Sequence, residues 1–247
     1  MTDRTSRRDE SPIIAQRKTL FRHPVLSMTS PAFSAAPCKD FSLIHVDQAL
    51  IVANKPTRLL SVPGRGPEKQ DCLVSRLQTE FPDALIVHRL DYDTSGLIVL
   101  ARGKQMHRAL SILFQDRLVE KRYLAVIEGK PENDSGEVDL PLIVDWPNRP
   151  LHKVDFEIGK SALTRYRALS FDATLDCTRV ALTPETGRTH QLRVHMQAIN
   201  HPILGDPLYA TDAAREKASR LLLHAEYLAF THPATKEPLS FECPAPF

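Results

Sequence analysis

An uninterrupted apolar run at residues 97–101 places the strongest constraint on how this chain folds. The run is short, contains two β-branched residues and directly follows the turn sequence Thr94-Ser95-Gly96, so it predicts a buried strand. Polar side chains crowd the segment just before the turn: His88, Arg89, Asp91 and Asp93. Polar groups in a loop that a rigid strand fixes at one end are typical of catalytic sites. The alternative is a turn whose Asp and Thr side chains only satisfy backbone amides.

The overall composition is that of a soluble chain, long enough for one large domain or two small ones. It has 247 residues, of which 42% are hydrophobic and 25% are charged. No apolar run approaches the roughly 18 residues of a membrane span, and the apolar core around Ile13 is too short for a secretory signal. The four cysteines lie far apart without a C-x-x-C pair, which fits free thiols in a reducing cytoplasm. We therefore expect a cytoplasmic protein that does not associate with membranes.

Charge is distributed differently in the first 40 residues and in the remainder. Residues 1–40 hold seven Lys and Arg and four Asp and Glu, which leaves 25 basic and 26 acidic residues in the rest. Because that remainder is nearly neutral, nucleic-acid binding there requires a local basic surface. Ser, Pro, Thr and Arg with little periodicity predict that residues 1–40 form a flexible tail, either solvated or in contact with RNA phosphate.

Strand patterns outnumber helical patterns beyond residue 41. Strands are expected at 50–53, 97–101, 121–129 and 178–183, in a closing hairpin of 221–230 with 239–242, and in a pairing of 153–159 with 162–169. Helices are expected at 73–81, 104–115, 189–198 with Thr189 as N-cap, and 212–219. Since strands and helices do not alternate regularly, residues 41–247 are predicted to form one α+β domain with a mixed, largely antiparallel sheet.

Two further segments carry polar side chains in a distinctive order. Gly187-Arg188-Thr189-His190-Gln191-Leu192-Arg193-Val194-His195 opens the helix expected at 189–198, with Arg188 at its mouth. Asn54-Lys55-Pro56 ends the first strand, because proline cannot continue a ladder, and a loop punctuated by Gly and Pro follows. That loop is not a phosphate-binding Walker loop, since no Gly-Lys-Ser/Thr opens a helix after it.

Together these three segments resemble the RluA-type family of RNA pseudouridine synthases. The family motif H-R-L-D-x-x-T-S-G is matched in full at 88–96, and the motif G-R-[ST]-H-Q-[LI]-R-x-H at 187–195. Residues 140–150 and 201–206 resemble the RluA branch itself, whose members modify a 23S rRNA hairpin loop and a tRNA anticodon loop. The resemblance spans roughly residues 41–247 and leaves no room for the N-terminal S4 RNA-binding module of many relatives. It implies the pseudouridine-synthase fold, with helices and loops flanking a central RNA-binding cleft.

The resemblance also implies roles for individual residues. Asp91 acts as an ionised carboxylate at the ribose, either attacking C1′ or taking the 2′ proton, and Arg193 holds it ionised and aimed. Arg89 fills the space left by the flipped base, Tyr123 offers that base a flat face, and Leu192 packs against it. RNA-binding cations are expected at four further positions: Lys55, Arg65, Arg149 and Arg188. Because uridine and pseudouridine are isomers, no metal or organic cofactor is implied. The expected partners are 23S rRNA and tRNA stem-loops, bound by a monomer.

Several signals leave alternatives open. His190 and His195 are five residues apart and so lie on different helix faces, which favours hydrogen-bonded structural histidines over metal ligands. Asp91 and Asp93 binding Mg²⁺ would indicate a nuclease, although no further acidic cluster completes the ligand set. A non-catalytic RNA-binding module would bind RNA and leave its uridines unchanged. Trp146, beside an arginine, is either half of an RNA-stacking pair or a plug in the core.

Overall fold

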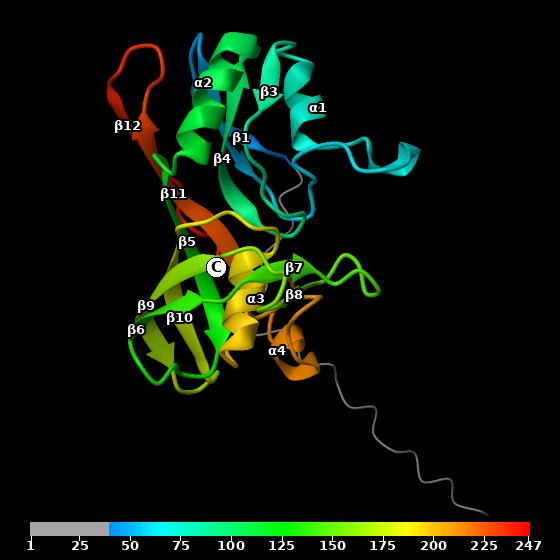
Figure 1. The fold of residues 1–247 in the computed structure, drawn as a ribbon, viewed down its shortest axis with the longest axis vertical. Coiled ribbons are helices and arrows are strands. Elements are labelled where there is room, and N and C mark those ends of the chain that lie inside the picture. The colour runs from blue at the N-terminus through cyan, green and yellow to red at the C-terminus, as the bar shows by residue number, and fades with distance from the viewer. Residues whose placement is uncertain (1–39) are drawn as a thin grey trace, which may run out of the picture. The chain divides into compact units, whose positions relative to one another are not determined.

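The fold is organised on a ten-stranded sheet within residues 40–247, the part of the chain that the computed structural model describes (Figure 1). Its strands follow the order β1-β2-β4-β11-β5-β10-β9-β6, with β3 paired to β4 and β12 paired to β11. Every pairing is antiparallel except that of β4 with β11. The predicted α+β class with a mixed, largely antiparallel sheet is therefore confirmed. The expected tail lies outside the described residues, apart from Asp40.

The strands and helices have the following bounds. The strands are β1 Ser42–Val46, β2 Leu50–Lys55, β3 Ala84–Ile86, β4 Ser95–Arg102, β5 Glu120–Glu128, β6 Ser135–Asp139, β7 Leu142–Val144, β8 His152–Val154, β9 Leu163–Asp172, β10 Cys177–Pro184, β11 Leu223–Thr231 and β12 Pro238–Glu242. The helices are the 3₁₀ turn η1 Pro67–Lys69, α1 Leu73–Gln78, α2 Gly103–Gln115, α3 Gln191–Ala198 and α4 Asp212–Glu216. Strands β7 and β8 form a separate two-stranded hairpin.

Strand β4 is buried on both of its faces, as the apolar run predicted. Because side chains alternate along a strand, Leu97 and Val99 pack into a cluster with Leu110 of α2. Ile98 and Leu100 point the other way, into a cluster with α1. Burying both faces fixes the register of the strand, since a slip of one residue would exchange the two sets. The loop that precedes β4 therefore starts from a rigid anchor.

A third cluster of buried residues packs α3 against β5 and β10. Leu192 and Met196 of α3 contact this cluster together with Val180 and Leu182 of β10. Helix α3 thus lies over the β10 side of the sheet, whereas α1 and α2 lie near β3 and β4 (Figure 1). The central strands β4, β11 and β5 join the two regions. Side chains from the loop before β4 and from the start of α3 consequently meet above these strands.

Not every predicted pairing is correct. The closing hairpin is confirmed as β11 with β12, but the pairing of 153–159 with 162–169 is wrong. Strand β8 pairs with β7, and β9 lies between β10 and β6. Alternation of side chains indicates a strand but does not choose its neighbour, which depends on contacts distant in sequence. None of the helices within 40–247 has the length and apolar character needed to cross a bilayer.

Candidate active site

The loop that carries Asp91 connects β3 to β4 and is held in place by the segment that follows β2. Ser61 Oγ donates to the Leu90 carbonyl oxygen at 2.8 Å and accepts from the Leu90 amide at 3.1 Å. The Leu59 amide donates to the Tyr92 carbonyl oxygen at 3.3 Å. These bonds hold the main chain on both sides of Asp91, so the position of its side chain is fixed although the side chain is not buried. That side chain remains 20% exposed.

Lys55 supports this loop from inside the protein, which corrects its expected role as an RNA contact. Its side chain is fully buried, and Nζ donates to the carbonyl oxygens of Pro56 at 2.9 Å, Leu59 at 2.7 Å and Tyr92 at 3.3 Å. Burial lowers the pKa of Lys55 to about 7, against the opposing charge of Asp91. A buried amine must donate its hydrogen bonds to acceptors within the protein. None of these donors is left for a phosphate.

Two other residues of the first motif have structural roles, His88 and Gly96. His88 Nε2 accepts from the Val99 amide at 3.0 Å, and its ring stacks on Phe114 at 4.4 Å. Burial lowers the pKa of His88 to about 3, which keeps the ring a neutral acceptor. Gly96 has a φ of 113°, and a Cβ there would lie 2.3 Å from the Ala225 carbonyl oxygen. Only glycine lets β11 approach β4 this closely.

The second motif enters α3 through His190, which has a left-handed φ of 57°, and not through Thr189 as expected. The Gln191 side chain closes this turn, because its Oε1 accepts from the Arg188 amide at 3.0 Å. Thr189 is therefore not required as a cap, and its Oγ1 accepts from the guanidinium of Arg89 at 3.0 Å instead. This hydrogen bond joins the two motifs across 100 residues of sequence.

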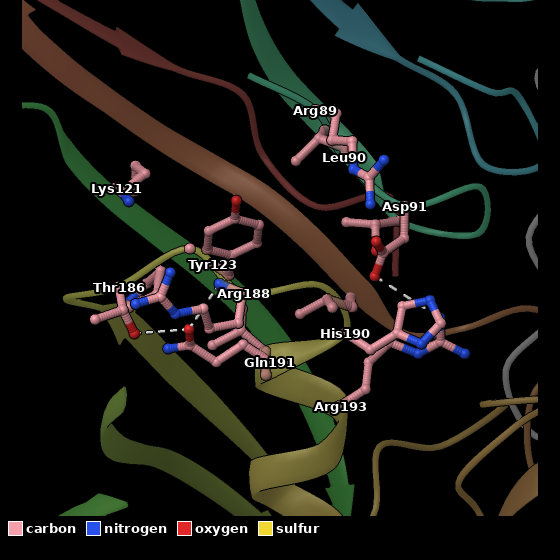
Figure 2. A pocket seen from close by; sticks show the side chains of 15 residues that line it. Arg89, Leu90, Asp91, Lys121, Tyr123, Thr186, Arg188, His190, Gln191 and Arg193 are labelled. Carbon is pink, nitrogen blue, oxygen red and sulfur yellow. Dashed lines mark hydrogen bonds and ion pairs between the residues drawn. The ribbon is translucent and has the colours of Figure 1, made fainter. Parts of the chain in front are cut away.

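Arg193 of α3 is the charged group at the floor of the site. It is 2% exposed, and its Nε and one terminal nitrogen donate to the two carboxylate oxygens of Asp206 at 2.7 and 2.6 Å. The other terminal nitrogen is 3.8 Å from Asp91 Oδ2 (Figure 2). Burial by itself lowers the pKa of Arg193, but the hydrogen bond and charge of Asp206 outweigh it and raise that pKa. A fixed cation therefore faces the Asp91 carboxylate.

Tyr209 completes the surroundings of Arg193. Its ring centroid is 5.1 Å from Arg193 Cζ. The Tyr209 hydroxyl accepts from the His152 amide at 2.9 Å and lies 2.7 Å from His190 Nδ1. Burial raises the pKa of Tyr209 to about 12 and lowers the pKa of His190 to about 4. At neutral pH both groups are uncharged, so the two side chains share a hydrogen bond between neutral partners.

A small pocket opens beside Asp91 between the two motifs (Figure 2). It measures about 100 Å³, and its walls include Tyr123 of β5, Leu192 of α3 and Thr94. Burial raises the pKa of Tyr123 and the charge of Asp91 adds to the effect, so the phenol is protonated. The Thr94 hydroxyl is buried and has no hydrogen-bond partner within residues 40–247. The pocket thus offers a flat aromatic face and an apolar side chain.

A larger groove of about 730 Å³ lies on the other side of Asp91. Arg65, Arg149 and Arg89 line it, and all three side chains are exposed. Arg188 is also exposed but lines the small pocket, where its Nε donates to the Ser161 carbonyl oxygen at 3.1 Å. Of the four cations expected to contact phosphate, three are therefore accessible and only Lys55 is not.

This arrangement suits chemistry on one nucleotide that has left its stack. The carboxylate of Asp91 stands between a small pocket with an aromatic wall and a groove lined by arginines. A base in the pocket would bring its ribose against Asp91 and direct the adjoining phosphates towards the groove. Extrusion of a base into a closely fitting pocket is how enzymes reach atoms that stacking hides.

Comparison with known proteins decides the family. Residues 49–198 match the family model described as RNA pseudouridylate synthase. The chain belongs to this family. It is 51% identical over 205 residues to the dual-specificity RNA pseudouridine synthase RluA of Yersinia pestis, covering 83% of this chain and 99% of the relative. It is 50% identical to the protein of the same name from Escherichia coli K12, covering 83% and 93%. The synthase is an isomerase that converts uridine to pseudouridine in RNA.

Solved structures agree with the fold of this synthase. Human RNA pseudouridylate synthase domain containing 1 superposes with a TM-score of 0.71 at 27% identity, covering 87% of both chains. Human RNA pseudouridylate synthase domain containing 4 gives a TM-score of 0.64 at 30% identity, covering 82% of this chain and 88% of that one. The pseudouridine-synthase fold inferred from the motifs is therefore confirmed.

Two parts of the synthase's site were missed from sequence: Asp206 and Tyr209. The only signal for Asp206 was its place in 201–206, a Pro/Gly loop that resembles the RluA branch. Nothing in that pattern linked it to Arg193. The link exists because α3 and the following loop fold back on each other, which places the carboxylate in full burial beside the guanidinium.

The remaining polar signals have structural explanations in this synthase. His195 shares hydrogen bonds with Thr164 Oγ1 at 2.9 Å and with the Leu140 carbonyl oxygen at 3.0 Å, as expected of a structural histidine. Within residues 40–247 no group of three or more His, Cys, Asp or Glu is arranged to hold a metal ion. Trp146 is 62% exposed, so it is not a core plug.

Proposed function

We propose that this synthase modifies uridines in two kinds of RNA loop, a 23S rRNA hairpin loop and a tRNA anticodon loop. Relatives that it matches almost end to end are named dual-specificity enzymes, and the motifs resemble the same branch. The observation that carries the proposal is the Asp91 carboxylate, which stands between the small pocket and the groove and 3.8 Å from a buried arginine. We expect the enzyme to act as a monomer in the cytoplasm.

Asp91 acts at the ribose of the flipped uridine. The reaction breaks the bond between N1 and C1′, joins C5 to C1′, removes the proton from C5 and adds one at N1, so the atoms balance without a cofactor. Asp91 either attacks C1′ or takes the 2′ proton. Both routes require the ionised carboxylate, and a neighbouring guanidinium favours that form. Because Asp206 holds Arg193, the cation keeps its position in either route.

The small pocket receives the uracil. Tyr123 presents an uncharged ring on which the base stacks, and Leu192 packs against the base. A raised pKa keeps the phenol of Tyr123 protonated, so it does not repel the Asp91 carboxylate. The turning of uracil between bond cleavage and reattachment requires a wall that holds the ring without binding it covalently, and these two side chains meet that requirement.

Arg89 takes the place of the flipped base in the RNA. It is exposed, two residues from Asp91, and borders both the pocket and the groove. Its hydrogen bond to Thr189 lies at the surface, where exchange for RNA partners costs little. Extrusion of a base costs roughly a few kcal/mol, and less in a loop where stacking is already incomplete. Arg65, Arg149 and Arg188 bind the phosphates on either side.

Pseudouridine mapping on an anticodon stem-loop RNA tests the proposal. The full chain should convert a loop uridine with EDTA present and without added metal. Asp91→Ala should lower the rate by about 10⁴-fold, the order of loss seen when a reacting group is removed, while RNA binding survives. Asp93→Asn is the matched control, because that carboxylate lies two residues away in the same loop, and it should keep most of the activity.

Each outcome has a distinct meaning. Conversion by Asp91→Ala at the wild-type rate would overturn the assignment of Asp91. Chain cleavage that EDTA abolishes would indicate the nuclease, and binding without conversion would indicate the RNA-binding module. Conversion of the tRNA loop but not of a 23S rRNA hairpin would contradict the dual specificity alone.

A further inference from the structure

The loop of the β7–β8 hairpin carries an aromatic ring that the fold does not use. Trp146 is the chain's one tryptophan and is 62% exposed. Arg149 lies over it, with the guanidinium carbon 3.9 Å from the ring centroid. Burial of such a ring would stabilise the folded protein, but this ring is exposed to water. Its loop connects β7 to β8 and projects from the sheet (Figure 1). Tryptophan is enriched at binding interfaces.

Hydrogen bonds make the tip of the hairpin stiff. The Asp145 amide donates to the Leu151 carbonyl oxygen at 2.8 Å, and the Leu151 amide donates to the Asn148 carbonyl oxygen at 3.0 Å. The Asn148 amide donates to the Asp145 carbonyl oxygen at 3.1 Å, and its side chain donates to Asp145 Oδ2 at 2.9 Å. A ring held on such a turn loses little further freedom when a ligand stacks on it.

The hairpin is also tied to the active site. The His152 amide donates to the hydroxyl of Tyr209, whose ring lies against Arg193. Val144, Arg149 and His152 form one side of the groove that reaches Asp91. Trp146 is therefore linked to the groove through Arg149, which lines it and lies over the indole ring, and this arginine complements the charge of an RNA strand.

We propose that Trp146, backed by Arg149, is a stacking platform for an unpaired base of the RNA substrate outside the flipped uridine. The inference rests on the proposed function, because it requires RNA in the groove beside Asp91. Every base has an aromatic face, so the platform accepts any of the four and contributes affinity without choosing a sequence. It favours RNA loops over duplexes, in which both faces of each base are already stacked.

Phe156 provides a matched control for Trp146. It is 77% exposed and lies two residues beyond the end of β8. Its neighbours in sequence are acidic, Asp155 and Glu157, whereas Trp146 lies against Arg149, a residue that lines the groove. A general effect of removing an exposed ring from this region would appear equally in both variants, whereas stacking on RNA would appear only at Trp146.

Intrinsic fluorescence tests the platform directly, because this ring is the one tryptophan of the full chain and can be excited selectively over the tyrosines. An anticodon stem-loop RNA titrated into the Asp91→Asn variant should quench the emission, with the midpoint that labelled RNA gives by anisotropy. A blunt duplex of the same stem should bind without quenching. Trp146→Ala should weaken stem-loop binding by about tenfold and raise KM with little change in kcat. Trp146→Phe should retain most of the affinity, and Phe156→Ala should retain all of it.

Other results would overturn the platform. These are unchanged emission at saturating stem-loop RNA, equal quenching by the duplex, or equal losses of affinity in Trp146→Ala and Phe156→Ala. Uridine conversion by the wild type, measured in parallel, separates the two hypotheses. If uridine is converted but the tryptophan emission stays unchanged, the platform alone is contradicted. If the stem-loop quenches the emission but its uridines are never converted, the proposed function alone is contradicted.

Discussion

The arginines of the site differ in their exposure to water. Arg193 lies at the floor of the site, and the other arginines lie at its rim. Arg193 is 2% exposed and gives two hydrogen bonds to Asp206, which is fully buried. The rim arginines are all exposed: Arg65, Arg89, Arg149 and Arg188. Burial of a charge is costly unless it is paired and hydrogen-bonded, so the floor arginine is committed to partners within the protein. The rim arginines keep donors for phosphate.

Lys55 shows that the same division holds for lysine. It was grouped with the rim cations from its sequence, but its Nζ meets three carbonyl oxygens in full burial. Burial, more than charge type, therefore decides whether a cation positions the catalytic loop or binds RNA. This difference predicts that floor variants lose stability and turnover, whereas loss of a rim arginine that only binds phosphate, such as Arg65, lowers only the affinity for RNA.

The largest effect is expected from Arg193→Met. It leaves the buried Asp206 carboxylate without a cation and with only the Leu208 and Tyr209 amides as donors, and loss of one member of a buried pair typically costs about 3–5 kcal/mol. It also removes the cation that faces Asp91, so turnover should fall together with the unfolding free energy. Urea unfolding and single-turnover conversion measure the two losses.

A double variant, Arg193→Met with Asp206→Leu, separates these two losses. Replacement of both charges by apolar groups should restore most of the stability but none of the activity. If the double variant recovered wild-type turnover, Arg193 would serve folding only, and the charge at the floor would have no part in the reaction.

An intermediate effect is expected from Lys55→Met, which keeps the length of the side chain but leaves three carbonyl oxygens without their shared donor. Unsatisfied buried acceptors cost about 1–3 kcal/mol. RNA affinity and its dependence on salt should be unchanged in the folded variant. If the salt dependence of RNA binding fell as much as in a rim variant, Lys55 would contact phosphate and would not belong with the buried cations.

The free energy of unfolding should also depend on pH differently in the wild type and in Lys55→Met. The pKa of Lys55 is lowered from 10.5 to about 7 by burial. Between these values the unfolded chain binds the proton and the folded chain does not, so stability from this group rises with pH over that window. It is fully present above 10.5 and is lost as pH falls to about 7. The rise should be absent from the variant.

The smallest effect is expected at the rim, from Arg65→Ala. Loss of one phosphate contact should weaken RNA binding a few-fold and reduce the slope of log affinity against log salt by about 0.7–0.9. The free energy of unfolding should change by no more than about 0.5 kcal/mol. Arg215→Ala is the control, since that arginine is exposed on α4 outside the groove. An equal change of slope in both variants would contradict a specific role of the rim arginines in binding phosphate.

Local patterns were sufficient for much of the fold, and the resemblance to a family supplied the outline of the site. Strand β4, helix α2 and the β11–β12 hairpin follow from periodicity and turn residues. The resemblance implied that Asp91 and Arg193 lie together, and the structure places their charged groups 3.8 Å apart. The strand, helix and hairpin were predictable because alternation and turn chemistry act over a few neighbouring residues.

Burial and partnership between distant residues required the folded chain. Lys55 and Arg65 look alike in the sequence, yet one is enclosed by three carbonyl oxygens and the other lies open to the groove. Asp206 acquires its role from Arg193, and Thr189 exchanges a capping role for a bond to Arg89. Whether a charged side chain pays the cost of leaving water depends on which acceptors the tertiary structure brings around it. That information is absent from residue type and spacing and appears when the sheet brings the two motifs together.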